Sequence, residues 1–248
     1  MKKILITNDD GISAPALDML RKSLCCYGEV TVVAPSAPRN ASGNSITLHK
    51  PVRVIRLDDG KYSVTGTTAD CVRIGVLTIL NGSVDLVVSG INQGANLGDD
   101  VNYSGTVAGA REGALLGIPS FAASLVTGHS MNFRQAAHIT AEVAEKILEN
   151  GLPERKLLNL NIPDIKDGAV KGIMVTRLGI RIYDNRVTKR IDPKGEDYYW
   201  IVGETLNCKM EKGTDFEAIS KNYASLTPLS LDYTDRKLVE DLKSWTSD

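Results

Sequence analysis

Ile4-Leu5-Ile6-Thr7-Asn8-Asp9-Asp10-Gly11, close to the start of this 248-residue chain, sets its architecture. The stretch begins with a short apolar run and ends with two neighbouring carboxylates and a glycine. A continuous apolar run is typical of a strand that is covered on both faces, as in a parallel sheet. Ligands on such sheets bind beyond the carboxyl ends of the strands, so the polar residues that follow the run mark a candidate site.

Strand and helix patterns alternate after this first strand. The patterns predict strands at 30–34, 86–88, 120–125 and 157–162, a hairpin formed by 52–57 and 62–64, and helices at 15–27, 68–80, 104–116 and 133–149. Alternation of this kind favours βαβ units with right-handed crossovers. We therefore expect an α/β fold: a Rossmann-like, mostly parallel sheet between helix layers.

The pattern changes after about residue 165. We expect antiparallel strands at 172–178 and 198–204, a helix at 215–223, a strand at 224–231 and a last helix at 235–245. The predicted organisation is a Rossmann-like catalytic core over 1–165 and a C-terminal extension of β-hairpins and helices over 166–248. A protruding hairpin is a plausible dimerisation device, so the extension is expected to serve oligomerisation.

The segment 181–197 between the two predicted strands is polar and charged. It contains Arg181, Tyr183, Arg186, Lys189 and Arg190. One interpretation is a flap that approaches a phosphate or a base, in this or a neighbouring subunit; the other is a solvated hairpin tip. The sequence leaves both open.

Composition narrows the class of protein. The chain has 29 Lys+Arg against 30 Asp+Glu, and this balance argues against a binder of duplex nucleic acid, which needs a basic face. No apolar run approaches the ~20 residues of a membrane helix, and the N-terminal run is too short for a signal peptide. The four cysteines form no C-x-x-C pair and are expected to be reduced. We expect a cytoplasmic protein without membrane contact.

Asp9 and Asp10 are the strongest local signal for a site. Two such charges ~4 Å apart repel by about 4 kcal/mol at an effective dielectric of 20, so something must compensate them. A hard divalent cation with oxygen ligands would do so. The alternative is a solvated turn in which one aspartate caps the next helix. Spacing alone does not separate these two hypotheses.

The next two strand ends add neutral and anion-binding groups. The loop 34–45 is long and offers amide and hydroxyl oxygens, among them Asn40, although the segment taken alone favours a flexible surface loop. The segment 89–100 is rich in glycine and polar residues, and a helix follows at Ser104. A helix N-terminus suits a phosphate, while Ser104 also suits an N-cap. Taken together, three strand ends favour a divalent cation plus a phosphate.

These motifs resemble those of the SurE family, the stationary-phase survival proteins, which are metal-dependent 5'/3'-nucleotidases. The similar stretches are Ile6-Thr7-Asn8-Asp9-Asp10-Gly11, Val33-Ala34-Pro35 with the loop 39–45, Gly66-Thr67-Thr68-Ala69-Asp70-Cys71-Val72, the segment 88–98, Tyr103-Ser104-Gly105-Thr106-Val107, Asn159-Leu160-Asn161-Ile162-Pro163 and Thr227-Pro228-Leu229. The resemblance covers most of the chain and is densest before Leu116.

The resemblance implies a set of site residues. The metal would be held by Asp9, Asp10, Asn40 and Asn92, with Asp9 and Asp10 also catalytic, and the phosphate by Asn96, Ser104, Gly105 and Thr106. Family members commonly have Ser where this chain has Asn40, but an amide oxygen can also ligate. The resemblance further implies one Mg²⁺ or Mn²⁺ per subunit and a homodimer or homotetramer.

The implied reaction is hydrolysis of nucleoside 5'- and 3'-monophosphates to nucleoside and phosphate. The alternative is a nucleotide-binding sensor without turnover. A nicotinamide-dependent oxidoreductase would need a G-x-G-x-x-G turn after the first strand, where this chain has Asn8-Asp9-Asp10-Gly11. A haloacid-dehalogenase-type phosphatase would need carboxylates two positions apart, whereas these are adjacent.

Overall fold

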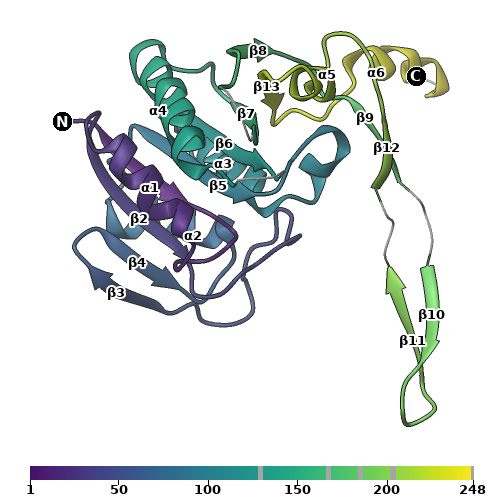
Figure 1. Cartoon of the computed structure of the whole chain (residues 1–248), viewed down its shortest axis with the longest axis horizontal. Helices are drawn as coiled ribbons and strands as arrows, with labels where there is room; N and C mark the ends of the chain where they lie inside the picture. The colour runs from purple at the N-terminus through teal and green to yellow at the C-terminus, as the bar shows by residue number, and fades with distance from the viewer. Residues whose placement is uncertain (128–130, 166–168, 184–186, 202–204, 247–248) are drawn as a thin grey trace.

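A nine-stranded sheet forms the body of the protein (Figure 1). The computed structural model describes residues 1–127, 131–165, 169–183, 187–201 and 205–246. The strand order is β3-β4-β2-β1-β5-β6-β7-β13-β8. The bounds are β1 (Lys3–Thr7), β2 (Glu29–Pro35), β3 (Val54–Asp58), β4 (Lys61–Val64), β5 (Leu86–Gln93), β6 (Ser120–Val126), β7 (Lys156–Pro163), β8 (Ile173–Val175) and β13 (Ala224–Ser230).

The centre of this sheet is parallel. β1 pairs with β2 and β5, and β5, β6 and β7 continue in the same direction. β3 is antiparallel to β4, and β13 is antiparallel to β7. The predicted fold class is therefore confirmed: an α/β fold with a mostly parallel sheet between helices.

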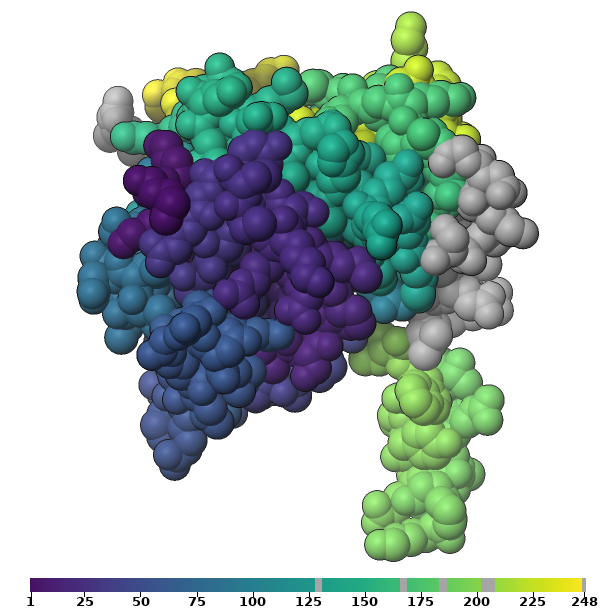
Figure 2. Space-filling view, turned by 60° about the vertical axis from the view of Figure 1, so that its left-hand side comes forward, coloured from purple at the N-terminus to yellow at the C-terminus, as the bar shows by residue number. Residues whose placement is uncertain are grey.

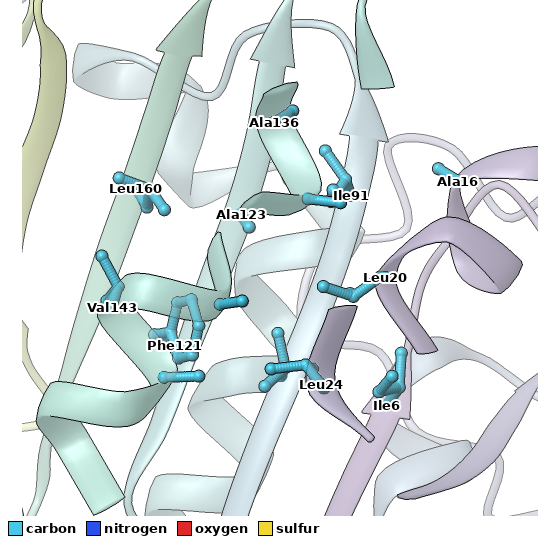
Figure 3. Close-up of a cluster of buried hydrophobic side chains, with 14 of the residues drawn as sticks. Ile6, Ala16, Leu20, Leu24, Ile91, Phe121, Ala123, Ala136, Val143 and Leu160 are labelled. Carbon is cyan, nitrogen blue, oxygen red and sulfur yellow. The ribbon is translucent and has the colours of Figure 1, made fainter. Parts of the chain in front are cut away.

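Helices cover both faces of the sheet. They are α1 (Pro15–Leu24), α2 (Thr68–Ile74), which continues as a π-helical turn over Gly75–Ile79, α3 (Gly105–Leu115) and α4 (Phe133–Asn150). Successive side chains of a strand point to opposite faces. Ile4 and Ile6 accordingly pack with α1 and α4, as part of the cluster in Figure 3, whereas Leu5 packs with α2. All three residues have no exposed surface, as expected for a strand covered twice.

Helix α3 lies unusually close to the sheet because its residues are small. A Cβ atom added at Gly109 would lie 2.5 Å from Ser89 Oγ, and one added at Gly113 would lie 2.2 Å from Ser120 Oγ. Both distances are far too short, so only glycine fits. The close packing brings the first turn of α3 to the carboxyl ends of β1 and β5.

The C-terminal part of the chain contributes both to the sheet and to a long arm. Helix α5 (Asp215–Ser220) precedes β13, and α6 (Arg236–Leu242) with a 3₁₀ turn (Lys243–Trp245) ends the described chain. The arm consists of β9 (Ile180–Tyr183) paired with β12 (Thr205–Lys209), and further out of β10 (Val187–Ile191) paired with β11 (Asp197–Ile201). It stands away from the body in both overall views (Figures 1 and 2).

Two expectations for this region need correction. Residues 172–178 contain only the short strand β8, which runs parallel to β13. The arm and α5 lie between these two strands in the chain and provide the long connection that parallel strands need. The polar segment 181–197 contains strands as well: β10 pairs along its whole length with β11, and Lys189 forms an ion pair with Asp197 at 2.6 Å. Charged side chains are tolerated there because every residue of β10 is exposed.

Arg186 lies outside the described residues, as does the side chain of Tyr183. The division of the chain at residue 165 stays a prediction. In the part of the chain that the structure describes, no helix combines the length and the apolar character needed to cross a membrane.

Candidate active site

The carboxyl ends of β1 and β5 open into a pocket of about 350 Å³. The loop after β2 and the segment before α3 complete its wall. The lining residues are Asp9, Asp10, Asn40, Ala41, Asn92, Gln93, Gly94, Ala95, Asn96, Asp100, Tyr103 and Ser104. Gly105 and Thr106, the first residues of α3, lie behind Ser104 and are buried. The structure thus brings all the sequence-predicted site residues to one place.

The turn after β1 is closed by Asn8, which sequence reasoning gave no role. Its Nδ2 donates to the carbonyl of Gly11 and its Oδ1 accepts from the Gly11 N–H, both at 3.1 Å. Gly11 has a φ of +96°, a conformation that other residues rarely adopt. Asparagine commonly closes turns in this way, so the Asn8-to-Gly11 spacing was the available signal. The turn points Asp9 and Asp10 toward the pocket.

Asp9 is held between β1 and α3 and is only 5% exposed. Its Oδ1 accepts a hydrogen bond from the Thr106 hydroxyl. A Cβ atom at Gly105 would lie 2.7 Å from Asp9 Oδ2, so a glycine is needed for the helix to approach this carboxylate. Burial raises the pKa of Asp9 to about 6; the bond from Thr106 lowers it, and the Asp10 charge raises it further.

Asp10 is less buried and accepts a hydrogen bond from the Gln93 N–H at 3.3 Å. Burial raises the pKa of this carboxyl as well. Among the described residues, no Lys, Arg or His forms an ion pair with Asp9 or Asp10. The two carboxylates therefore share an edge of the sheet without a compensating cation from this part of the chain.

The loop after β2 is fastened to the rest of the site by backbone hydrogen bonds. The Arg39 N–H donates to the Asp9 carbonyl at 2.7 Å, and the Gly43 N–H donates to the Tyr103 carbonyl at 3.0 Å. Asn40 lies between these two attachments. The loop consequently presents the exposed Asn40 side chain to the pocket beside Asp9 and Asp10.

The segment after β5 is fixed by asparagines. Asn92 Nδ2 donates to the Gly94 carbonyl at 2.9 Å, and no described residue donates to its Oδ1. Asn96 donates from Nδ2 to Ser124 Oγ at 2.7 Å, and its main chain bonds the side chains of Asn159 and Asn161 at 2.8–3.0 Å. Asn159 and Asn161 are both fully buried on β7. They lie in a stretch that resembles the family motif, but the sequence alone predicted no role for them. They fix the backbone at Asn96.

The start of α3 combines a cap with free donors. Ser104 Oγ accepts from the Val107 N–H at 3.0 Å, so the residue is the N-cap and also lines the pocket. Because Oγ is the acceptor in that bond, its own proton remains available. The Thr106 hydroxyl is used by Asp9. The first N–H groups of a helix have no backbone partners within the helix. Here the Val107 N–H is taken by Ser104 Oγ and the Thr106 N–H by the Asp9 carboxylate, which leaves the Gly105 N–H as a donor for an anion.

The donor set fits a hard divalent cation. Within the described ranges, no cluster of three or more His, Cys, Asp or Glu side chains is positioned to hold a metal. A metal at this edge would therefore depend on two carboxylates, Asp9 and Asp10, together with neutral amide oxygens such as those of Asn40 and Asn92. Oxygen-only ligands of this kind suit Mg²⁺ and Mn²⁺ rather than zinc or copper.

Parallel α/β sheets with acidic residues and a helix start at one edge are typical of enzymes that act on phosphate groups. Comparison with known proteins is more specific. A family model described as "Survival protein SurE" matches residues 4–185, and the chain belongs to this family. The predicted family is confirmed.

Relatives and a solved structure agree with this assignment. The protein named 5'-nucleotidase SurE from Pelobacter propionicus is 47% identical, over 98% of both chains. Its namesake from Geobacter sulfurreducens is 45% identical, over 98% of this chain and 93% of that one. The crystal structure of SurE protein from Aquifex aeolicus superimposes with a TM-score of 0.88 at 43% identity, over 98% and 99% of the two chains.

Proposed function

We propose that this chain is a 5'-nucleotidase that hydrolyses nucleoside 5'- and 3'-monophosphates to nucleoside and phosphate. Relatives named 5'-nucleotidase SurE match 98% of the chain, and this observation is the main support for the proposed enzyme class. The pocket supports it, since acidic metal-binding groups face anion-binding donors across a space of about 350 Å³. A phosphomonoesterase needs both groups within reach of one substrate.

The proposed metal ligands are the side chains of Asp9, Asp10, Asn40 and Asn92, which would hold one Mg²⁺ or Mn²⁺ per subunit. When bound, such a cation polarises a phosphoryl oxygen and lowers the pKa of a water molecule. Among the described residues, no cation pairs with these two carboxylates and no donor uses the Oδ1 of Asn92, and both observations support this ligand set. Asp9 and Asp10 are also the proposed catalytic residues.

The proposed phosphate site is the start of α3 with Asn96. The groups available there are the hydroxyl proton of Ser104 and the N–H group of Gly105, because the Thr106 N–H serves Asp9 and the Val107 N–H serves Ser104 Oγ. Thr106 and Asn96 contribute through their position, because the Thr106 hydroxyl serves Asp9 and the Asn96 Nδ2 serves Ser124. The helix dipole favours the charge that develops on the phosphoryl oxygens.

A kinetic panel tests this function. The protein is incubated with nucleoside 5'- and 3'-monophosphates, and released phosphate is measured with Mg²⁺, with Mn²⁺ and with EDTA. We expect turnover with either metal and its loss in EDTA. Nucleotide binding without release of phosphate under any metal would instead identify a sensor. Undiminished turnover in EDTA after exhaustive dialysis would overturn the metal assignment alone.

The arm supports a homodimer or homotetramer. β10 and β11 form a two-stranded sheet of their own, and the side chains of Ile191, Tyr199, Trp200 and Ile201 are between 56% and 88% exposed. An isolated two-stranded hairpin is marginally stable in water. A second copy of the chain that covers these apolar side chains would stabilise the arm.

A further inference from the structure

The stretch Gly66-Thr67-Thr68-Ala69-Asp70-Cys71-Val72 resembles a family motif, yet none of its residues lines the pocket. It forms the start of α2. Thr67 is the N-cap of this helix: its Oγ1 accepts from the Asp70 N–H at 3.2 Å, and the Asp70 carboxylate accepts from the Thr67 N–H at 2.9 Å. A reciprocal pair of this kind stabilises a helix start. It leaves the Thr67 hydroxyl proton and further lone pairs of Asp70 available to other partners.

The loop after β2 uses these remaining groups. Residues 36–53 contain neither helix nor strand, so the loop depends on bonds to the rest of the protein. Asp70 accepts from the Thr47 N–H at 2.9 Å and from the Thr47 hydroxyl at 2.6 Å. The Thr67 hydroxyl donates to the Ser45 carbonyl at 2.7 Å. The capping pair of α2 is therefore also the attachment point of the loop.

Asp70 is buried at this attachment and is only 6% exposed. A Cβ atom at Gly66 would lie 2.6 Å from Asp70 Oδ2, so only glycine lets the chain pass this close to the carboxylate. Burial raises the pKa of Asp70, but the hydrogen bonds from Thr47 and Thr67 outweigh burial and hold the pKa below its ordinary value. The anchor is thus a charged carboxylate whose donors come from both the helix and the loop.

The start of α2 meets both segments that carry the proposed metal ligands. The Thr68 hydroxyl donates to the Asn8 carbonyl at 3.3 Å, in the turn that presents Asp9 and Asp10. Asn40 belongs to the loop that Asp70 holds, and it lines the pocket. The helix start consequently fixes the loop relative to the two carboxylates.

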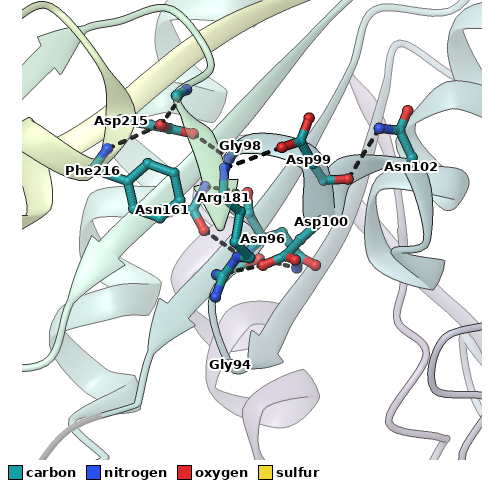
Figure 4. A network of polar contacts seen from close by, with 12 residues as sticks. Gly94, Asn96, Gly98, Asp99, Asp100, Asn102, Asn161, Arg181, Asp215 and Phe216 are labelled. Atoms are coloured by element: carbon teal, nitrogen blue, oxygen red, sulfur yellow. Dashed lines mark hydrogen bonds and ion pairs between the residues drawn. The ribbon is translucent and has the colours of Figure 1, made fainter. Parts of the chain in front are cut away.

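A second buried aspartate holds another wall of the pocket (Figure 4). Asp215, which has no exposed surface, accepts from the N–H groups of Gly98 and Gly179 at 2.8 Å. It thereby fastens the segment 94–104 to the base of the arm. That segment carries Asn96 and Ser104 of the proposed phosphate site, whereas the loop after β2 carries a proposed metal ligand. The two anchors therefore serve different parts of the site.

We infer that Asp70 is a positioning residue of the metal site: it fastens the loop after β2 to the start of α2 and so keeps Asn40 at the cation. The inference rests on the proposed function, because it takes Asn40 as a metal ligand. Asp70 itself touches neither metal nor substrate and acts through the loop. Without the anchor, metal binding would have to order the loop, and the cost of that ordering would lower the affinity.

The test is a double-substitution cycle with Asp70→Asn and Asn40→Ala, in which Mn²⁺ affinity is measured by EPR. The asparagine oxygen can replace Oδ2 and accept from the Thr67 N–H, but the N–H₂ group then faces the Thr47 N–H. The substitution therefore breaks the loop attachment and keeps the helix cap. We expect the Kd for Mn²⁺ to rise about tenfold in each single variant. The double variant should stay within about threefold of Asn40→Ala, because the position of the loop no longer matters once the ligand is absent.

Glu217→Gln is the matched control. Glu217 occupies in α5 the position that Asp70 has in α2, three residues after the N-cap Thr214. Its carboxylate accepts from the Gly213 N–H at 2.6 Å and pairs with Lys221 at 2.7 Å, and none of these residues lines the pocket. We expect the Kd for Mn²⁺ to stay within about twofold of the parent. If Asp70→Asn does not melt cooperatively, Thr47→Val replaces it in the cycle, since it removes one loop bond without altering α2.

Hydrogen exchange of the metal-free protein provides a readout that does not depend on the cation. In Asp70→Asn the amides of Gly43, Ser45 and Thr47 should exchange about tenfold faster than in the parent, while those of α3 keep their rates. Equal exchange rates at the three loop amides in variant and parent would show that Asp70 does not fasten the loop, and would overturn the inference.

The inference is also overturned if Asp70→Asn leaves the Mn²⁺ affinity unchanged, or if the losses of the two single variants add in the double variant. Additive losses would show that Asp70 acts through α2 and the turn at Asn8 rather than through Asn40. Either result would leave turnover by the parent, and hence the proposed function, intact. A parent that binds Mn²⁺ but releases no phosphate would count against the proposed function alone, because the affinity cycle requires no turnover.

Discussion

The carboxyl edge of the sheet and the outer arm differ in which side chains they bury and which they expose. At the sheet edge, polar side chains are buried and cross-bonded: Asp9 is 5% exposed, and Asn159 and Asn161 are fully buried. In the outer arm, every residue of β10 and β11 is exposed, including large apolar side chains. Charge is thus buried at the sheet edge, and apolar surface is exposed on the arm.

Both arrangements cost stability in a single chain. A buried carboxylate without a cation loses its hydration, and an exposed apolar hairpin gains nothing from burial. The cost at the sheet edge is expected to be offset by a bound ion, and the cost on the arm by another subunit. Substitutions of the metal-binding side chains at the sheet edge should therefore reduce function without reducing stability. Substitutions of the apolar side chains on the arm should reduce assembly without reducing the stability of the single chain.

Asp9→Asn should have the largest effect. The amide is a weaker metal ligand than a carboxylate, so we expect kcat to fall by about 10³-fold or more and Mn²⁺ affinity to fall with it. The metal-free variant should melt at the same temperature as the parent or higher, since a buried charge has been removed. Phosphate release, manganese EPR and thermal melting provide the three measurements. Asp18→Asn, at an exposed aspartate paired with Lys61, is the control and should change none of them.

The pH dependence of stability should show the same buried charge. The pKa of Asp9 is about 6 in the folded protein against an ordinary 3.8, so between these values the folded state binds more protons than the unfolded state. In the absence of metal, the Asp9 carboxyl therefore leaves the free energy of unfolding unchanged below about pH 4 and lowers it by up to about 3 kcal/mol above pH 6. The free energy of unfolding should thus fall more steeply with rising pH in the parent than in Asp9→Asn. Equal slopes in EDTA would contradict this.

Asp215→Asn should weaken the base of the arm. Asparagine keeps one acceptor but directs an N–H₂ group at the Gly98 N–H, so a buried donor loses its partner. We expect a loss of about 2 kcal/mol in urea unfolding. Asp235→Asn provides the comparison, because Asp235 caps the exposed helix α6 and asparagine caps equally well. A loss of the same size in both variants would show that burial of Asp215 adds nothing.

Thr106→Val removes the hydroxyl that bonds Asp9 and keeps the shape of the side chain. A hydrogen bond to a charged group contributes about 1.5–3 kcal/mol, so Mn²⁺ affinity should fall about tenfold or more. Thr106→Ser restores the hydroxyl and should recover most of the affinity. Equal affinities in the Val and Ser variants would remove Thr106 from the support of Asp9.

The sequence was informative where periodicity and strand ends determine structure. The apolar run at Ile4-Leu5-Ile6 predicted β1 and, through it, the edge on which the pocket lies. The same reasoning could not show that the Thr106 hydroxyl faces Asp9 or that Asn159 supports Asn96, because these contacts join residues 63 to 97 positions apart. Such contacts depend on packing between α3, β1 and β7, which periodicity does not encode.

In the arm, by contrast, the sequence pattern did not predict the strands that the structure contains. Residues 181–197 were expected to separate two strands, yet they contain most of β9 and all of β10. Alternation identifies a strand when one of its faces is buried, and neither face of β10 is buried in the single chain. The ladder between β10 and β11 depends instead on cross-strand pairs such as Lys189 with Asp197.

Trp200→Ser should have the smallest effect on the single chain and a clear effect on assembly. Trp200 is 56% exposed and lies opposite Thr188 in the β10–β11 ladder, outside the hydrophobic clusters of the sheet. The free energy of unfolding of the monomeric fold should therefore change by no more than about 0.5 kcal/mol. If a second copy covers this face, sedimentation should show a shift toward smaller species, because a buried Trp is a frequent centre of binding energy. Leu77→Ser, at an equally exposed apolar residue on the body of the protein, is the matched control and should leave the sedimentation profile unchanged. A parent that sediments as a monomer would show that the arm is stable without a partner, and the contrast between the two regions would then hold only for the sheet edge.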